Sequence, residues 1–207
     1  MDKLIAEFIF FFTVIDPVGT VPVFLAATAG VAAHYRAKIA WRAFAISAIL
    51  LVLSVVLGQI TLEYLSINFA AFRVAGGVIL FMFALNMIFG DSKPDSEIAE
   101  AEAHSDEALD KAVYPLAIPS IAGPGAMMAA IVRTDNQLYG LSDQVLTVAI
   151  ILAVLGIVLA CMLLATRIER LIGRSGASVV SRVMGLLFAA IAADGVMTGI
   201  RDYFGLA

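Results

Sequence analysis

Long apolar segments alternate with short polar ones along the whole chain. Six of the apolar segments are each about long enough to cross a ~30 Å hydrocarbon core at 1.5 Å per residue. They lie at 4–31, 38–61, 69–89, 113–132, 144–165 and 179–200. The pattern predicts an all-α membrane protein whose six transmembrane helices form a single transmembrane domain, residues 1–207.

The composition agrees with this pattern and narrows the class of partner. The 207 residues are 62% hydrophobic and 14% charged, whereas soluble domains are about 25% charged. The net charge is −4 and no basic tract is present, so the lipid bilayer and not nucleic acid is the expected partner. The acidic stretch 90–112 predicts a solvated loop. Its spacing resembles no calcium loop, and neither a metal nor a cofactor is expected.

The distribution of Lys and Arg predicts the orientation in the membrane. The loops after the first, third and fifth segments hold nine of these residues, and the opposite side holds four. Cytoplasmic loops carry the excess of positive charge. We therefore expect these three loops, the acidic loop included, to be cytoplasmic and both termini to be periplasmic or extracellular.

Two sequence matches indicate an internal repeat. A shift of 102 residues places PVGTVP, residues 17–22, on PSIAGP, residues 119–124. A shift of 109 residues places the RV-x-G pattern at Arg73 on the one at Arg182. Three segments in each half force the second half to enter the membrane from the opposite side. The expected fold is thus a 3+3 inverted-topology repeat, with repeat 1 at 1–89 and repeat 2 at 113–207.

The matching proline pairs predict that helices 1 and 4 are broken near the middle of the membrane. Carbonyl groups freed at such a break must face protein or a wet cavity, and half-helix ends attract a carboxylate or an ammonium group. Proline kinks that only shape the bundle are the alternative. If the breaks bind substrate, twelve residues are the candidates: Asp16, Pro17, Gly19, Thr20, Pro22, Asn86, Pro119, Ser120, Gly123, Pro124, Gly125 and Asp194.

Charged residues inside the apolar segments carry further expectations. A charged side chain at the bilayer centre costs about 2.5–3.5 kcal/mol on insertion scales. Asp16 is therefore a candidate partner for a proton or an ammonium group, or an N-cap with Pro17 as first helical residue. Asp194 is a second candidate, or a partner of Arg201. Arg73 is expected to extend toward the lipid headgroups.

Both break motifs resemble those of a known family. The DPxGxxPxF pattern runs from Asp16 to Phe24, and AIPxxAGPGA runs from Ala117 to Ala126. They are similar to motifs of the MarC family of bacterial inner-membrane proteins, and the resemblance covers all six segments and the acidic loop. It implies a transporter of small neutral amino acids, with glycine or alanine as substrates, in the inner (plasma) membrane.

Residue pattern and resemblance together favour a secondary transporter that binds its substrate at mid-membrane between the two breaks. Export coupled to protons is one form of this hypothesis, and oligomers are compatible with it. A small-solute channel is the alternative, because opposed half-helices also build pores. An intramembrane enzyme is disfavoured: no HExxH, GxGD or YD signature occurs, and both histidines, His34 and His104, lie in loops.

The orientation can be tested by labelling the acidic loop. With Cys161 replaced, Ile98→Cys should resist an impermeant thiol reagent in intact cells, because the loop is expected to face the cytoplasm. Permeabilised cells are the control and should label fully. Labelling in intact cells would show that the Lys and Arg distribution gives the wrong orientation.

Overall fold

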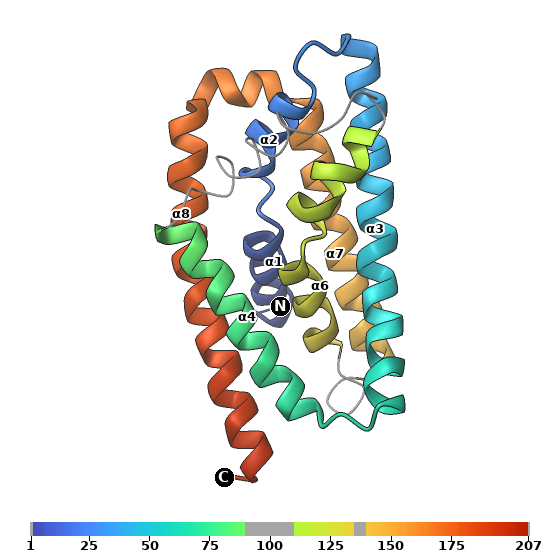
Figure 1. Ribbon diagram of the computed structural model, residues 1–207, viewed down its shortest axis with the longest axis vertical. Coiled ribbons are helices and arrows are strands. Elements are labelled where there is room, and N and C mark those ends of the chain that lie inside the picture. The colour runs from blue at the N-terminus through green and yellow to red at the C-terminus, as the bar shows by residue number, and fades with distance from the viewer. Residues whose placement is uncertain (1, 90–109, 135–139, 207) are drawn as a thin grey trace.

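The computed structural model describes residues 2–89, 110–134 and 140–206, and these residues are almost entirely helical (Figure 1). The elements in chain order are α1 (Asp2–Ile15), α2 (Thr20–Ala27), α3 (Ala33–Tyr64), α4 (Phe69–Phe89), η1 (Asp110–Ala112), η2 (Val113–Ile121), α6 (Pro124–Arg133), α7 (Leu141–Leu163) and α8 (Ala165–Phe204). Most of the acidic stretch 90–112 lies outside the described residues, so the expected loop stays a prediction there.

The described helices confirm the membrane class. Five stretches are long and apolar enough to cross a bilayer, the first being Lys3–Ala27, which contains both α1 and α2. The bent pair Asp110–Ile121 and Pro124–Arg133, whose two parts meet at an angle of 55°, is a sixth candidate if it is counted as one span. An all-helical membrane protein with a broken fourth span is thus confirmed.

Several helices extend beyond the apolar segments that predicted them. The segment at 38–61 lies within the 32-residue α3, and the segment at 179–200 lies within the 40-residue α8. Helical backbone continues past the apolar residues because its hydrogen bonds are satisfied internally in any solvent. Within α8, Gly173 adopts a φ of +66°, which glycine accepts without steric cost, and the helix turns there.

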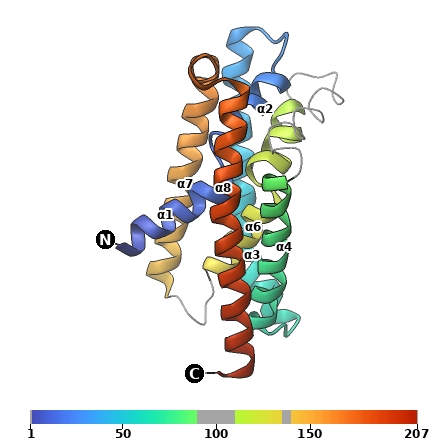
Figure 2. The ribbon, with the colours of Figure 1, turned by 90° about the vertical axis from the view of Figure 1, so that its left-hand side faces the viewer.

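The broken spans lie between two pairs of long helices (Figures 1 and 2). Helix α4 packs along α8 on one side, and α3 packs along α7 on the other. Between them, α2 packs against η2 and α1 packs against α6. The largest buried cluster surrounds these half-helices and includes Ile15, Val21, Leu116, Ile121 and Leu155. The fold therefore buries the first break in the protein interior, whereas the second break is only partly buried.

Close backbone contact holds α4 and α8 together in antiparallel directions. A Cβ on Gly77 would lie 3.0 Å from the carbonyl oxygen of Ala192, and one on Gly199 would lie 3.0 Å from that of Ala70. Small residues permit such approach in membranes, where packing rather than hydrophobic burial drives helix association. Behind this seam, Leu80 and Phe188 belong to a second, smaller apolar cluster.

The close contact between α4 and α8 at Gly77 and Gly199 predicts an effect on stability. Gly199→Ala should lower the stability of the purified protein by about 1–3 kcal/mol, because the added methyl group meets the backbone of α4. Thermal unfolding in detergent is the measurement. Gly156→Ala on α7 is the matched control, since a Cβ there meets nothing within 4 Å. Equal unfolding temperatures for the two variants would contradict the close seam.

Candidate functional site

The break in the first span is organised by Asp16, which is 1% exposed. Its φ is +52°, which turns the chain out of α1. The Asp16 carbonyl accepts a hydrogen bond from the Thr20 amide at 3.2 Å. Its carboxylate Oδ1 accepts the Gly19 amide N–H at 3.0 Å, and Oδ2 accepts the Ser181 hydroxyl of α8 at 2.7 Å. The side chain thus satisfies backbone at the break and connects the break to α8.

The first break leaves no space for a side chain at position 19. A Cβ on Gly19 would lie 2.6 Å from the Ser181 hydroxyl oxygen and would also collide with the Asp16 carboxylate. Gly19 is the N-cap of α2, without a side-chain cap. The expectation that Asp16 caps a helix whose first residue is Pro17 is therefore wrong, because the helix begins at Thr20 and Asp16 bonds within the preceding turn.

The second break separates η2 from α6. Gly123 is the N-cap of α6 and Pro124 occupies its first position, where the missing N–H removes no helical hydrogen bond. A Cβ on Gly123 would lie 2.5 Å from the Pro119 carbonyl oxygen. Ser120 is 2% exposed, and its hydroxyl has no hydrogen-bond partner among the described residues.

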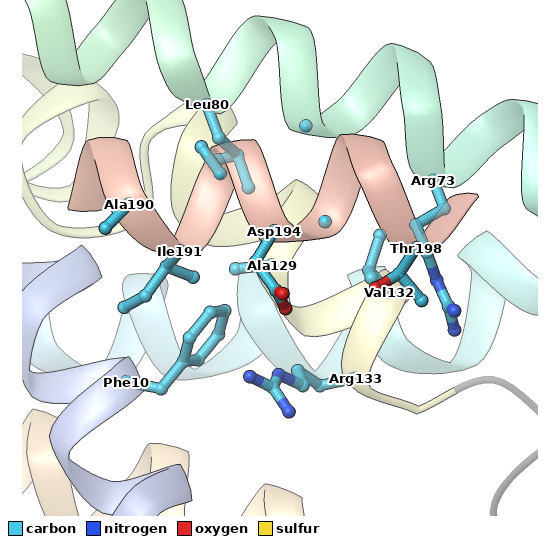
Figure 3. Close-up of a pocket in the computed structure, with 13 residues that line it drawn as sticks. Phe10, Arg73, Leu80, Ala129, Val132, Arg133, Ala190, Ile191, Asp194 and Thr198 are labelled. Atoms are coloured by element: carbon cyan, nitrogen blue, oxygen red, sulfur yellow. The ribbon is translucent and has the colours of Figure 1, made fainter. Parts of the chain in front are cut away.

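A pocket of about 480 Å³ lies between α1, α4, α6 and α8 (Figure 3). Small residues form much of its wall, and Leu80 and Ala192 of the second apolar cluster also border it. The residues that line it are Phe10, Arg73, Gly77, Leu80, Ala129, Val132, Arg133, Ala190, Ile191, Ala192, Asp194, Gly195 and Thr198.

Three charged side chains line the pocket, and they differ in their partners. Arg73 is buried, and its Nη1 forms an ion pair with Asp202 of α8 at 2.8 Å. Arg133, the last residue of α6, lies over the Phe10 ring at 4.2 Å from the ring centroid. Asp194 is exposed and forms no ion pair or hydrogen bond with the described residues. Figure 3 shows the Arg133 guanidinium and the Asp194 carboxylate directed into the same space.

The pocket contains one of the twelve predicted residues, Asp194. The others lie elsewhere. Those of the first break, Asp16, Pro17, Gly19, Thr20 and Pro22, are buried in the core; Ser120 and Gly125 are also buried; Gly123 and Pro119 are half-buried; Pro124 and Asn86 are exposed. The breaks and the pocket therefore lie at two separate places, and α1, α6 and α8 each contribute residues to both.

Two expectations about charged residues change with the structure. Arg73 does not extend to the headgroups but is buried beside Asp202. Arg201 forms its ion pair with the adjacent Asp202 at 3.4 Å rather than with Asp194. Sequence reasoning missed Arg133 and Phe10. Arg133 directly follows the apolar segment 113–132, and its place about one half-helix beyond a break was a usable signal.

Within residues 2–89, 110–134 and 140–206, no three His, Cys, Asp or Glu side chains gather closely enough to hold an ion. Besides Arg73, which is paired with Asp202, the pocket is lined by the Arg133 guanidinium and the Asp194 carboxylate.

Comparison with known proteins supplies the family. The MarC family integral membrane protein model matches residues 1–204. A UPF0056 membrane protein of Archaeoglobus fulgidus is 34% identical over 201 residues, covering 95% of this chain and 92% of the relative. YhcE of Escherichia coli, also a UPF0056 membrane protein, is 31% identical, covering 95% and 91%. The UPF0056 inner membrane protein MarC of Salmonella arizonae is 29% identical, covering 90% and 89%. No solved structure matches the chain. The protein therefore belongs to the MarC family of integral membrane proteins, as its two break motifs predicted.

Proposed function

We propose that the protein is a secondary transporter of small neutral amino acids, such as glycine and alanine, and that the pocket binds the substrate. The observation that carries this proposal is that Arg133 and Asp194 line the same pocket. Both line one pocket of about 480 Å³, and neither forms an ion pair with a described residue. An α-amino acid is the simplest ligand that satisfies both charges at once.

Each end of a zwitterion has a suitable partner here. A guanidinium binds a carboxylate through two parallel N–H donors, so Arg133 receives the substrate carboxylate. The Asp194 carboxylate accepts hydrogen bonds from the ammonium group. Arg73 is already paired with Asp202. The charges left for the ligand therefore sum to zero, which favours a neutral amino acid over an acidic or a basic one.

The apolar wall of the pocket suits a short side chain. Phe10, Leu80 and Ile191 border the space together with several glycine and alanine residues. Apart from the charged residues, Thr198 is the one polar side chain among the lining residues, so the wall offers few partners for a longer, functionalised side chain. Apolar walls with a few converging polar groups are typical of small-molecule sites.

The arrangement of the spans supports alternating access by an inverted 3+3 repeat. Each half contributes a broken span, a long continuous span and a third span, and the two third spans, α4 and α8, run antiparallel along each other. The pocket takes α1 and α4 from the first half and α6 and α8 from the second. Sites at a repeat interface are typical of secondary transporters. In this proposal the substrate lies beside the half-helices α1 and α6, not between the two breaks.

Recognition of both charges predicts a competition pattern. In proteoliposomes, unlabelled glycine and alanine should inhibit uptake of labelled alanine, whereas propionate and ethylamine should not, because each lacks one of the two charged groups. Counterflow should be seen, since a carrier exchanges labelled for unlabelled substrate. Equal inhibition by propionate or ethylamine, or an absence of counterflow, would contradict the proposed carrier site.

Substitution of the two charged residues tests the site directly. Arg133→Gln and Asp194→Asn should each weaken alanine binding by about 10- to 100-fold, because a hydrogen bond to a charged group contributes about 1.5–3 kcal/mol. Alanine-dependent thermal stabilisation in detergent measures the affinity. Arg182→Gln is the matched control, since Arg182 is an exposed residue of α8 outside the pocket. Unchanged affinity in both pocket variants would exclude this site.

A further inference from the structure

A short helix connects the last two spans at one end of the molecule. Helix α7 ends at Leu163 and α8 begins at Ala165, but the span that α8 contributes starts only at Ser175, beyond the turn at Gly173. Residues 165–172, the connecting helix, therefore lie outside both neighbouring spans. Figure 1 shows the connecting helix running across the top of the molecule from α7 to the long part of α8, and Figure 2 shows it end-on.

One side of the connecting helix packs on the protein. Residues three and four apart share a side of a helix, so Ala165, Ile168 and Ile172 lie together. Ala165 is buried and belongs to the large apolar cluster, against which Ile168 also packs. Ile172 borders a small crevice with Val21 of α2. This side of the connecting helix therefore has its partner within the protein.

The opposite side of the connecting helix carries two arginines and a leucine. Arg167, Arg170 and Leu171 are three and four residues apart, and all three are exposed. Leu171 is 86% exposed. Neither arginine forms an ion pair with a residue that the structure describes, and Glu169, the one acid in 165–172, interacts with another residue. The outer side thus presents two positive charges beside a large apolar side chain.

Other residues at the same end of the molecule mark the level of the lipid headgroups. Helix α3 begins at this end (Figures 1 and 2), and Tyr35 and Trp41, both exposed, lie near its start. Tyrosine and tryptophan are enriched where membrane and water meet. Lys38 and Arg42, also exposed, lie among them. The distribution of Lys and Arg predicts this end to be cytoplasmic, and the cytoplasmic leaflet is the one that carries anionic lipids.

We propose that the connecting helix binds anionic phospholipids, with Arg167 and Arg170 at the lipid phosphates and Leu171 among the acyl chains. A guanidinium donates two parallel N–H bonds to a phosphate. Basic helices with exposed leucines lie in the membrane interface for this combination of reasons. A free phosphate ion satisfies only the arginines, whereas a phospholipid also surrounds the leucine. The proposal is independent of the amino-acid pocket, which no residue of the connecting helix lines.

Lipid-dependent thermal stabilisation of the purified protein tests the two arginines. In a neutral detergent, phosphatidylglycerol should raise the unfolding temperature of the wild type more than phosphatidylcholine does. Glycerol phosphate, which has no acyl chains, should have no effect. Arg167→Gln combined with Arg170→Gln should weaken phosphatidylglycerol binding by about 25-fold, because each arginine near an anionic surface contributes about fivefold.

Two matched variants separate lipid binding from a general effect of charge. Arg167→Lys combined with Arg170→Lys keeps both charges and should retain the response to phosphatidylglycerol. Lys3→Gln combined with Arg201→Gln also removes two charges, but each of these is paired with an aspartate elsewhere in the protein, so this variant should retain the response. An equal loss of response in the last variant would reduce the effect to net charge and overturn the proposal. Equal stabilisation by glycerol phosphate would overturn it in favour of free phosphate.

Fluorescence tests the position of Leu171 while both arginines are intact. Trp41 is the only tryptophan in the sequence, so Leu171→Trp in a Trp41→Phe background places a single reporter on the connecting helix. In vesicles of phosphatidylcholine and phosphatidylglycerol, bromine atoms on the acyl chains should quench this reporter strongly, and iodide in the water should quench it weakly. The reverse pattern would place the side chain in water and refute the proposed interfacial helix.

Discussion

The fold depends on one constraint: inside a bilayer, every backbone polar group must have a partner within the protein. Each broken span frees such groups within the span. At the first break, the Asp16 carboxylate accepts the Gly19 amide and its carbonyl accepts the Thr20 amide. At the second, the Ala122 amide donates to the Ala117 carbonyl at 2.8 Å. Because these partners come from the chain itself, the first break can be fully buried and the second partly buried between the long helices.

The pocket follows from the breaks, although it does not lie at them. A broken span consists of two half-helices that can leave the direction of a straight span, and η2 and α6 differ by 55°. Helix α6 has only ten residues and ends at Arg133, beside α1. Because α4 and α8 are held together by close backbone contact, they do not move in to fill the space beside these short helices. The space that remains is lined by the Arg133 guanidinium of α6 and the Asp194 carboxylate of α8.

The sequence was sufficient to predict the spans and the breaks but not the pocket. Apolar segments predict spans because burial in lipid is a local property of each residue, and two prolines five residues apart predict a break for a local steric reason. The position of a side chain relative to other helices is not local. Arg73 meets Asp202, 129 residues away, and Ser181 meets Asp16, 165 residues away. The spacing of residues along the sequence does not predict such long-range contacts. Asp194 was found because an acid within an apolar segment is conspicuous, whereas Arg133 was hidden by its position at a segment end.

In the proposed site, the ion pair between Arg73 and Asp202 sets which charges remain for a ligand. Arg73, Arg133 and Asp194 all line the same space, so an unpaired Arg73 would be a second cation available to Asp194. Asp202 lies two turns further along α8 and holds the Arg73 guanidinium at 2.8 Å. Opposite charges at such distances attract strongly where water is scarce. By engaging Arg73, Asp202 leaves Asp194 without a protein partner and keeps the remaining charges balanced. A residue outside the pocket thus sets its electrostatic character, and the pocket presents one positive and one negative group to a ligand instead of an excess of positive charge.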